Sequence, residues 1–346
     1  MGREYTMSKT ALVISGGGSK GAFAVGVLKW LAKHRPEVDF DIIAGTSTGA
    51  LIAPLAALKE FTLLERVYTS VNTEDVILKG NLGERFLRHT SLYSVQPLIA
   101  LVKREFTPER YNRLMESGKE VFISTVCLQT RRITYFTTSD MPASQHYDVI
   151  RIANYQEMVR AIIASANQPV FMPPVEIRST EEQPRQYVDG GVMEYAPIQV
   201  TIDAGATDIL AIVLSPEQSE PKNQKYDRLV DILLRTISSF SEEVGTNDIR
   251  IPRLYSEAIG YINSLKRQVA QETHLDMAEV DRVFGMEHSP FAGRREVNIH
   301  IVRPERELPT NGLDFDRGIM RQMVEMGFQA AAALEALPIP ATAPIA

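Results

Sequence analysis

The chain has 346 residues, of which 44% are hydrophobic and 23% are charged, a composition typical of a globular protein with one large or two modest domains. The formal net charge of −6 argues against a nucleic-acid-binding protein, which usually carries a basic face. The single cysteine, Cys127, excludes a disulfide framework and a cysteine-rich metal site.

The hydrophobic segments of the chain are short. No stretch approaches the roughly 20 apolar residues that a membrane-spanning helix needs. The first ten residues are polar and contain no apolar signal core. We therefore expect a cytoplasmic protein, either free or peripheral at membranes, unless it is secreted by a route that leaves no such signal.

The first 60 residues alternate between strand and helix patterns. An apolar strand over 11–15 precedes a glycine loop, and a helix follows as far as about residue 35. A second strand over 41–44 leads into another glycine-bounded turn and a helix over 51–60. Such alternation predicts an α/β fold with a mostly parallel central sheet.

Further elements follow along the chain. Residues 61–120 are mostly helical, and the polar loop 215–225 is the best candidate for an internal boundary. Amphipathic helices lie beyond that loop, with apolar sets over 227–240 and 255–265. The remaining predicted elements are strands over 120–130, 131–138, 186–189, 208–214 and 297–302, and helices over 157–166 and 315–337.

The turn Gly45-Thr-Ser-Thr-Gly49 follows the second predicted strand and fits the G-x-S-x-G nucleophile elbow. A serine on a sharp strand-to-helix turn needs neighbours without side chains, and Gly45 and Gly49 provide them on either side of Ser47. The positive end of the following helix dipole would stabilise an alkoxide there. The motif therefore predicts a serine acyl hydrolase with Ser47 as nucleophile.

The loop Gly16-Gly-Gly-Ser-Lys-Gly21 follows the first strand and fits G-x-G-x-x-G. Its backbone N–H groups could converge on the oxyanion of a tetrahedral intermediate. One alternative is a dinucleotide-binding loop, and another is a tight turn with no further role. The dinucleotide fingerprint needs an acid at the C-terminal end of the second strand, whereas Asp39 and Asp41 precede that strand.

Ser47 needs a partner that accepts its proton. None of the six histidines lies in a recognisable triad context: His34, His89, His146, His274, His288 and His300. Asp189 ends an apolar strand and precedes Gly190 and Gly191, which clear side chains around it. Burial would raise the pKa of its carboxyl from about 3.9 toward a useful value for a base. Asp-Gly is also a common turn dipeptide, so a turn cap is the alternative role for Asp189.

The three motifs, Gly16-Gly-Gly-Ser-Lys-Gly21, Gly45-Thr-Ser-Thr-Gly49 and Asp189-Gly-Gly191, resemble in this order those of the patatin-like phospholipase family. The segment 164–174 also resembles the family's segment before the aspartate. The resemblance covers roughly residues 10–214.

This resemblance implies a three-layer α/β/α patatin-like fold with a mostly parallel central sheet. The amphipathic pattern after the polar loop adds C-terminal helices to it. It implies a Ser47–Asp189 dyad, an oxyanion hole from Gly16, Gly17 and Gly18, and lipid acyl hydrolysis with no metal or cofactor. The motif-supporting residues are then Gly21, Gly45, Gly49, Gly190 and Gly191.

The extent of the resemblance, the polar loop over 215–225 and the Pro/Ala-rich end together divide the chain into four parts. We expect an N-terminal arm over 1–9, a patatin-like catalytic domain over 10–214, a mostly helical region packed on the core over 215–337, and a disordered tail over 338–346.

The expected substrate is a lipid or another acyl ester, with transient contact to a membrane surface and no nucleic-acid partner. The apolar set over 227–240 is either a lid or membrane-docking helix or a packing surface, so a homo-oligomer stays open. The alternative functions are a carboxylesterase or thioesterase on soluble substrates, a nucleotide-binding Rossmann protein, and an effector regulated through residues after Leu214.

Overall fold

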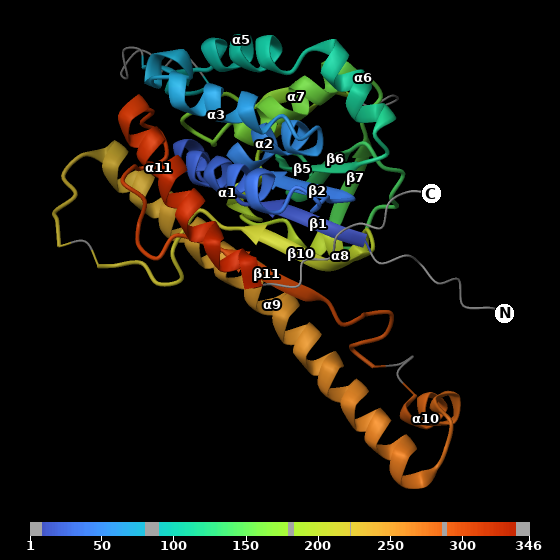
Figure 1. The fold of residues 1–346 in the computed structure, drawn as a ribbon. Coiled ribbons are helices and arrows are strands. Elements are labelled where there is room, and N and C mark those ends of the chain that lie inside the picture. Colours follow the sequence, from blue (N-terminus) through green and yellow to red (C-terminus); the bar gives the residue numbers. More distant parts are fainter. Residues whose placement is uncertain (1–8, 80–89, 179–182, 222, 286–288, 337–346) are drawn as a thin grey trace.

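The computed structural model describes residues 9–79, 90–178, 183–221, 223–285 and 289–336 (Figure 1). The predicted tail, and the predicted N-terminal arm apart from Lys9, lie outside these residues. The strands are β1 (Lys9–Ile14), β2 (Ile42–Thr46), β3 (Leu78–Lys79), β4 (Tyr93–Ser94), β5 (Glu120–Cys127), β6 (Arg132–Thr137), β7 (Tyr147–Arg151), β8 (Val175–Ile177), β9 (Arg185–Asp189), β10 (Ala206–Ile212) and β11 (Asn298–Val302).

The helices lie between these strands and after them. They are α1 (Gly21–His34), α2 (Thr48–Ala57), α3 (Phe61–Ser70), α5 (Gln96–Glu105), α6 (Pro108–Glu116), α7 (Tyr155–Ala166), α8 (Ile198–Asp203), α9 (Leu229–Thr273), α10 (Met277–Phe284) and α11 (Arg317–Ala330). Short 3₁₀ helices are η1 (Gly18–Lys20), η2 (Thr73–Asp75), η3 (Gly190–Val192) and η5 (Ala331–Ala336).

A mostly parallel sheet forms the centre of the molecule. Its strand order is β11-β10-β1-β2-β5-β6-β7, and β9 pairs with β5 and β8 beside this path. The strands from β11 to β5 are parallel, whereas β6 and β9 are antiparallel to β5. The prediction of an α/β fold with a mostly parallel sheet is confirmed.

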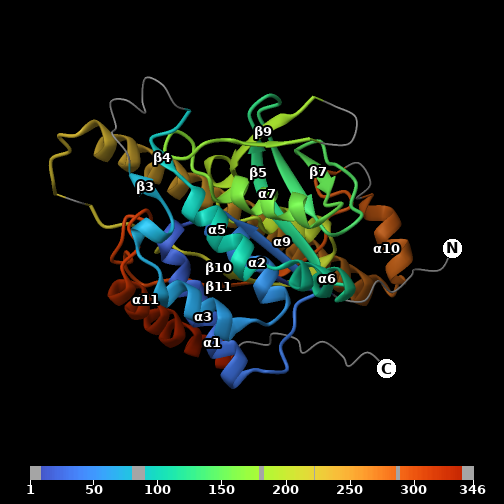
Figure 2. The ribbon, with the colours of Figure 1, turned by 90° about the horizontal axis from the view of Figure 1, so that it is seen from above.

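Both faces of the sheet are covered by helices, which gives the three-layer arrangement (Figure 1). Alternate residues of β1 enter different cores: Leu12 and Ile14 pack with α1, α2 and α7, while Ala11 and Val13 pack with α8 and α9. This is the alternation that a strand buried on both faces requires. Seen from above, α5 and α7 lie over the strands and α9 runs on their far side (Figure 2).

The C-terminal region is joined to this core in two ways. Strand β11 pairs in parallel with β10, and α11 packs along α1. The two apolar sets expected on separate amphipathic helices lie instead on the single 45-residue helix α9, which continues through Pro252. The first part of α9 contacts the core, and its far end carries α10 away from the sheet (Figure 1).

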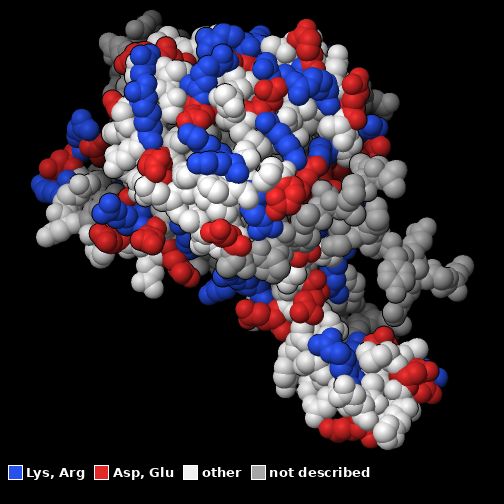
Figure 3. Space-filling model, in the orientation of Figure 1, with Lys and Arg blue, Asp and Glu red and all other residues white. Residues whose placement is uncertain are grey.

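Two further observations concern the length and apolarity of the described helices and the charges on one face of the molecule. No helix in the described ranges is both long enough and apolar enough to cross a membrane. On the face shown in Figure 3, Lys and Arg side chains are interspersed with Asp and Glu.

Candidate active site

Strand pairing brings Ser47 and Asp189 together. Strands β2 and β9 both pair with β5, but they run toward each other along the same edge of it. Thr46 lies opposite Ser124, and Asp189 lies opposite the next residue, Thr125. Ser47 directly follows Thr46, so the predicted nucleophile and the predicted base meet where the two strand ends face each other.

Ser47 occupies a tight turn between β2 and α2. Its backbone has φ 56° and ψ −119°, a conformation that non-glycine residues adopt only under constraint. A Cβ atom on Gly45 would lie 2.3 Å from the backbone of Gly49, and one on Gly49 would lie 2.1 Å from the Ile14 carbonyl oxygen. The strand–turn–helix geometry that the glycine spacing predicts is therefore present, and both glycines are needed for close backbone packing.

The glycine loop after β1 lies beside this turn. A Cβ on Gly16 would be 3.4 Å from the Ser47 Cβ, and one on Gly21 would be 2.4 Å from the Thr48 hydroxyl oxygen. The two glycine motifs therefore pack directly against each other. Gly17 and Gly18 have positive φ values of 153° and 58°, so the loop turns sharply at these two residues.

The N–H groups of the loop are not equivalent. The Gly16 N–H donates to the Tyr195 carbonyl oxygen at 2.9 Å, and the Ser19 N–H donates to the Gly312 carbonyl oxygen at 2.9 Å. The expectation that Gly16 donates to an oxyanion is therefore corrected, because its only N–H group is already bonded. Among the described residues, the N–H groups of Gly17 and Gly18 have no acceptor, so these two remain candidate oxyanion donors.

Asp189 is buried, with 7% of its surface exposed. Its carboxylate accepts the Gly191 N–H at 2.8 Å, so the side chain does cap the turn at η3, as the alternative interpretation of Asp-Gly holds. Burial raises the pKa of Asp189 to about 6, although hydrogen bonds from the Gly191 N–H and the Ser47 side chain lower it in part. The Asp189 carboxylate therefore caps the turn at η3 and contacts the Ser47 side chain at the same time.

Gly190 has no side chain, which lets the chain after Asp189 approach β5 closely. A Cβ on this residue would lie 2.5 Å from the Ser124 hydroxyl oxygen, which itself donates to Glu194 at 2.9 Å. Only glycine lets the chain turn this closely against β5 directly after Asp189.

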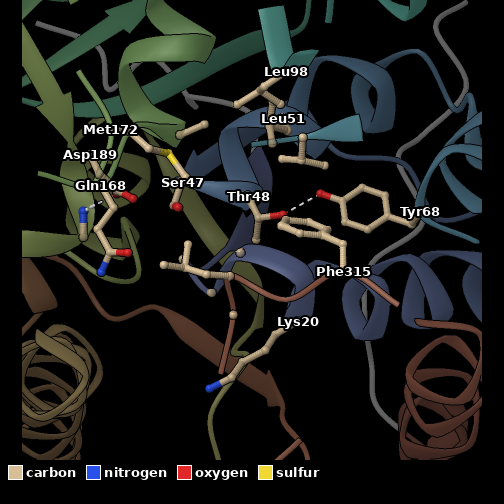
Figure 4. A pocket seen from close by; sticks show the side chains of 18 of the residues that line it. Lys20, Ser47, Thr48, Leu51, Tyr68, Leu98, Gln168, Met172, Asp189 and Phe315 are labelled. Atoms are coloured by element: carbon tan, nitrogen blue, oxygen red, sulfur yellow. Dashed lines mark hydrogen bonds between the residues drawn. The ribbon is translucent and has the colours of Figure 1, made fainter. Parts of the chain in front are cut away.

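A cavity of about 200 Å³ opens beside these residues and includes Ser47, Asp189 and the loop glycines in its wall (Figure 4). The wall beyond Ser47 is apolar and comes mainly from α2, α3, α5 and α7: Leu51, Leu55, Leu64, Val67, Leu98 and Ile162. Other wall residues come from α9 and from the loop before α11. Figure 4 shows the ammonium group of Lys20 directed away from Ser47.

Several wall residues were not expected from the sequence. Leu234 and Ile237 of α9 line the cavity, as do Tyr195 and Phe315. Leu234 and Ile237 belong to the apolar set over 227–240, for which the sequence left a lid, a membrane-docking helix and a packing surface open. Nothing in the local sequence marks Tyr195 or Phe315 as cavity residues, because they reach the site only through the tertiary fold.

The histidines do not supply a base in the described part of the chain, since none of those placed there lines the cavity. His34 stacks on Trp30, His146 and His274 are exposed, and His300 lies on β11. The other two, His89 and His288, lie outside the described residues.

Comparison with known proteins adds an independent result. A family model described as patatin-like phospholipase matches residues 12–202. The neuropathy target esterase sws of Drosophila melanogaster is 25% identical over 285 residues, which cover 82% of this chain and 18% of that protein. Patatin-like protein 1 of Arabidopsis thaliana is 25% identical over 263 residues, which cover 68% of this chain and 60% of that protein. The chain thus spans less than two thirds of the length of both relatives.

Among solved structures, VipD from Legionella pneumophila aligns with a TM-score of 0.41 and 12% identity over 94% of this chain and 66% of that chain. The family match includes both glycine motifs and Asp189. It therefore favours the hydrolase interpretation of the glycine loop over the dinucleotide-binding one. The chain belongs to the patatin-like phospholipase family.

Proposed function

We propose that the protein is a serine lipid acyl hydrolase of the phospholipase A or lysophospholipase type, with Ser47 and Asp189 as its catalytic dyad. The observation that carries this proposal is the meeting of β2 and β9 on β5, which puts a buried carboxylate beside an elbow serine. Both residues face one apolar cavity.

The first half-reaction forms an acyl-enzyme. Asp189 accepts the hydroxyl proton of Ser47 while the serine oxygen attacks the ester carbonyl carbon. The carbonyl oxygen takes up the electron pair and is held by the N–H groups of Gly17 and Gly18. The intermediate then expels the alcohol, for example a lysolipid, which takes the proton from Asp189.

The second half-reaction returns the enzyme to its starting state. Asp189 accepts a proton from water, and the resulting hydroxide attacks the acyl carbonyl carbon through the same oxyanion site. The bond to Ser47 breaks, the serine oxygen recovers the proton from Asp189, and the fatty acid leaves. A base pKa of about 6 suits this role, because the carboxylate is ionised at neutral pH and is more basic than an ordinary aspartate.

The cavity supports a substrate with a long apolar acyl chain. Its wall beyond Ser47 is apolar, and transfer of each methylene group from water into such a wall contributes about 0.8 kcal/mol. A soluble substrate with a short acyl chain would gain little from the part of the cavity beyond Leu51.

Two variants test the dyad. Ser47→Ala and Asp189→Asn should each lower ester hydrolysis by at least about 10³-fold in a protein that stays folded. Asp203→Asn is the control, because Asp203 on α8 accepts a hydrogen bond from the hydroxyl of Tyr147 on β7 and lies outside the cavity wall. Full activity in either dyad variant would sink the mechanism. Hydrolysis of p-nitrophenyl esters without hydrolysis of phospholipid vesicles would favour the carboxylesterase alternative.

Transient contact with a lipid surface is part of the proposal. Three segments that line the cavity also carry exposed apolar side chains, which together we name the apolar rim: Val170, Met193, Leu229, Ile232 and Phe240. On α9 the rim residues Leu229, Ile232 and Phe240 lie on a different face of the helix from Leu234 and Ile237 of the cavity wall. Exposed apolar side chains gathered on one face of a helix mark an interaction surface. A membrane presents both the acyl chains that fit the cavity and an apolar layer that accepts the rim.

The charges near the start of α9 favour a neutral lipid surface. Lys225 pairs with Asp227 at 2.9 Å, and Arg228 pairs with Asp231 at 2.7 Å, so these cations are already balanced. We therefore expect contact with zwitterionic phosphatidylcholine vesicles that depends little on salt.

The rim is tested with two double variants on the same helix. Ile232→Asp/Phe240→Asp alters rim residues that are 46% and 65% exposed, and Leu254→Asp/Tyr261→Asp alters control residues that are 63% and 66% exposed. Insertion of an Ile and a Phe contributes up to about 3 kcal/mol, so the rim variant should lose about 10- to 100-fold in vesicle binding and vesicle hydrolysis. Activity on a soluble ester should not change.

Equal losses in the two double variants would remove the rim from the proposal. So would a concentration-dependent dimer that the rim variant abolishes while vesicle hydrolysis is retained, because the surface would then bind a second copy.

A further inference from the structure

Strands β2 and β9 lie end to end along β5, so their alignment alone does not fix the distance between Ser47 and Asp189. Each strand is bonded to β5, and strands that follow one another along an edge share no ladder bonds. Ser47 also leaves the ladder in a constrained conformation with φ 56°. Groups outside β2 and β9 must therefore fix the position of Ser47 relative to Asp189.

The C-terminal end of α7 bonds to both residues. The Ser47 N–H donates to the Ser165 hydroxyl oxygen at 2.9 Å, and the Ser165 hydroxyl donates to the Ser124 carbonyl oxygen on β5 at 2.6 Å. Two residues after Ser165, the Asn167 carbonyl oxygen accepts the Asp189 N–H at 3.0 Å. One short segment thus contacts the nucleophile turn, the base and the strand between them.

We propose that Ser165 and Asn167 form a brace that sets the relative position of Ser47 and Asp189, with Ser165 as a positioning residue for the nucleophile. The inference rests on the proposed Ser47–Asp189 dyad and assigns a role to a segment outside it. Neither brace residue contacts the ester in this scheme, because each acts through the backbone N–H of a dyad member.

The Ser165 hydroxyl is well suited to this role because it is fully buried and bonded on both sides. Removing it would leave the Ser47 N–H and the Ser124 carbonyl without this partner in a site closed to water. The constrained turn at Ser47 would then be free to relax toward a more common conformation. A displacement of about 1 Å in a reacting group can lower a rate about 100-fold.

The brace also accounts for the sequence of the segment 164–174. The Asn167 side-chain amide donates to the Pro173 carbonyl oxygen at 2.7 Å and closes the turn after α7. Within this closed turn, Gln168 and Met172 contribute to the cavity wall. The segment therefore both holds the dyad and shapes the cavity beside it.

The chain offers a closely matched control for Ser165. Ser256 on α9 is also buried, donates to the Val297 carbonyl oxygen at 2.7 Å and accepts the Val297 N–H at 2.9 Å. Ser165→Ala and Ser256→Ala thus remove the same kinds of bond, but only the first lies next to the dyad. The melting temperature should therefore decrease by a similar amount in the two variants.

The readouts are kcat and KM on a soluble p-nitrophenyl ester and the rate at which a fluorophosphonate labels Ser47. For Ser165→Ala we expect kcat and the labelling rate to fall together by about 10- to 100-fold, with KM changed less than about threefold. Ser256→Ala should keep kcat. Ser165→Cys, which retains a weak donor and acceptor, should give an intermediate kcat and serves as the test if Ser165→Ala fails to fold.

The outcomes separate the brace from the dyad. The brace is overturned if kcat of Ser165→Ala, or of Ser165→Cys when only that variant folds, stays within about twofold of the wild type. It is overturned equally if Ser256→Ala loses as much kcat as Ser165→Ala. A wild-type protein without ester hydrolysis overturns the proposed function and the brace with it, and this result differs visibly from an active wild type with an unaffected Ser165 variant.

Discussion

The burial of Asp189 makes the pH dependence of catalysis a sharp test of its role. Burial raises the pKa of this carboxyl to about 6, from an ordinary value of 3.8. A general base must be ionised to accept a proton, so activity should be present above this pKa and be lost as the pH falls through it. The acidic limb of kcat/KM should therefore lie near pH 6.

The size of the effect follows from the ionised fraction. With a pKa of about 6, roughly half of the molecules carry an ionised Asp189 at pH 6, and about one tenth do so at pH 5. An aspartate at the ordinary value of 3.8 would remain about nine tenths ionised at pH 5. The two cases thus differ by about tenfold in activity at pH 5.

The assay is kcat/KM for a soluble ester between pH 4.5 and pH 8, a range set by the shifted pKa of about 6. The released acid is quantified by chromatography after quenching, so that detection does not depend on pH. Melting temperature at each pH confirms that the enzyme stays folded. Glu194→Gln is the control for the other buried acids, and it should leave the acidic limb in place.

A flat profile down to pH 5 in a folded enzyme would refute the assignment of a buried Asp189 as base. A limb near pH 6 that survives in Asp189→Asn would refute it as well, because another group would then be titrating.

Three further predictions concern the loop and the buried carboxylates. Gly18→Ala places a Cβ 2.0 Å from the Gly312 carbonyl oxygen and should cost about 10²–10³ in kcat, whereas Gly118→Ala, also at positive φ but with open space around it, should keep kcat. Asp189→Asn should lower hydrolysis by at least about 10³-fold yet raise the free energy of unfolding at pH 8 by up to about 3 kcal/mol, with no gain near pH 3, because the cost of burying the charge exists only where Asp189 is ionised. Burial and the charge of Asp248 raise the pKa of Glu194 to about 8, so wild-type stability should fall as the pH rises toward 8, and Glu194→Gln should flatten that slope in urea titrations.

The local parts of this site could be predicted from the sequence because their chemistry is local. The spacing of Gly45, Ser47 and Gly49 specifies a turn whose side-chain space is set by its own residues. The strands on either side are apolar runs bounded by glycine and polar residues, and their predicted positions agree with β1, β2, β5 and β9 to within a few residues.

The parts that depend on long-range pairing could not be predicted in this way. The register of β2 and β9 on β5 determines that Ser47 meets Asp189, and register depends on packing across the whole sheet. The Gly16 N–H was expected at an oxyanion, yet it bonds to the Tyr195 carbonyl oxygen. A loop sequence alone does not reveal which distant carbonyl lies within reach.

The helix pattern after residue 214 was partly misleading for a physical reason. Proline usually interrupts a helix, and Pro252 lies between the apolar sets over 227–240 and 255–265. Helix α9 nevertheless continues through Pro252, and contacts on both sides stabilise it: Val244 and Ile249 pack under the sheet, and Ser256 bonds to Val297. Tertiary contacts outweigh the local preference here.

The central claim, that Ser47 is the activated nucleophile of a dyad with Asp189, is tested most directly by mass spectrometry after fluorophosphonate treatment. A fluorophosphonate forms a stable bond with an activated serine oxygen and releases fluoride. We predict one adduct per chain on the peptide that contains Ser47, absent in Ser47→Ala and formed at least about 100-fold more slowly in Asp189→Asn. An adduct on another serine, or labelling of Ser47 at an unchanged rate in folded Asp189→Asn, would contradict the claim.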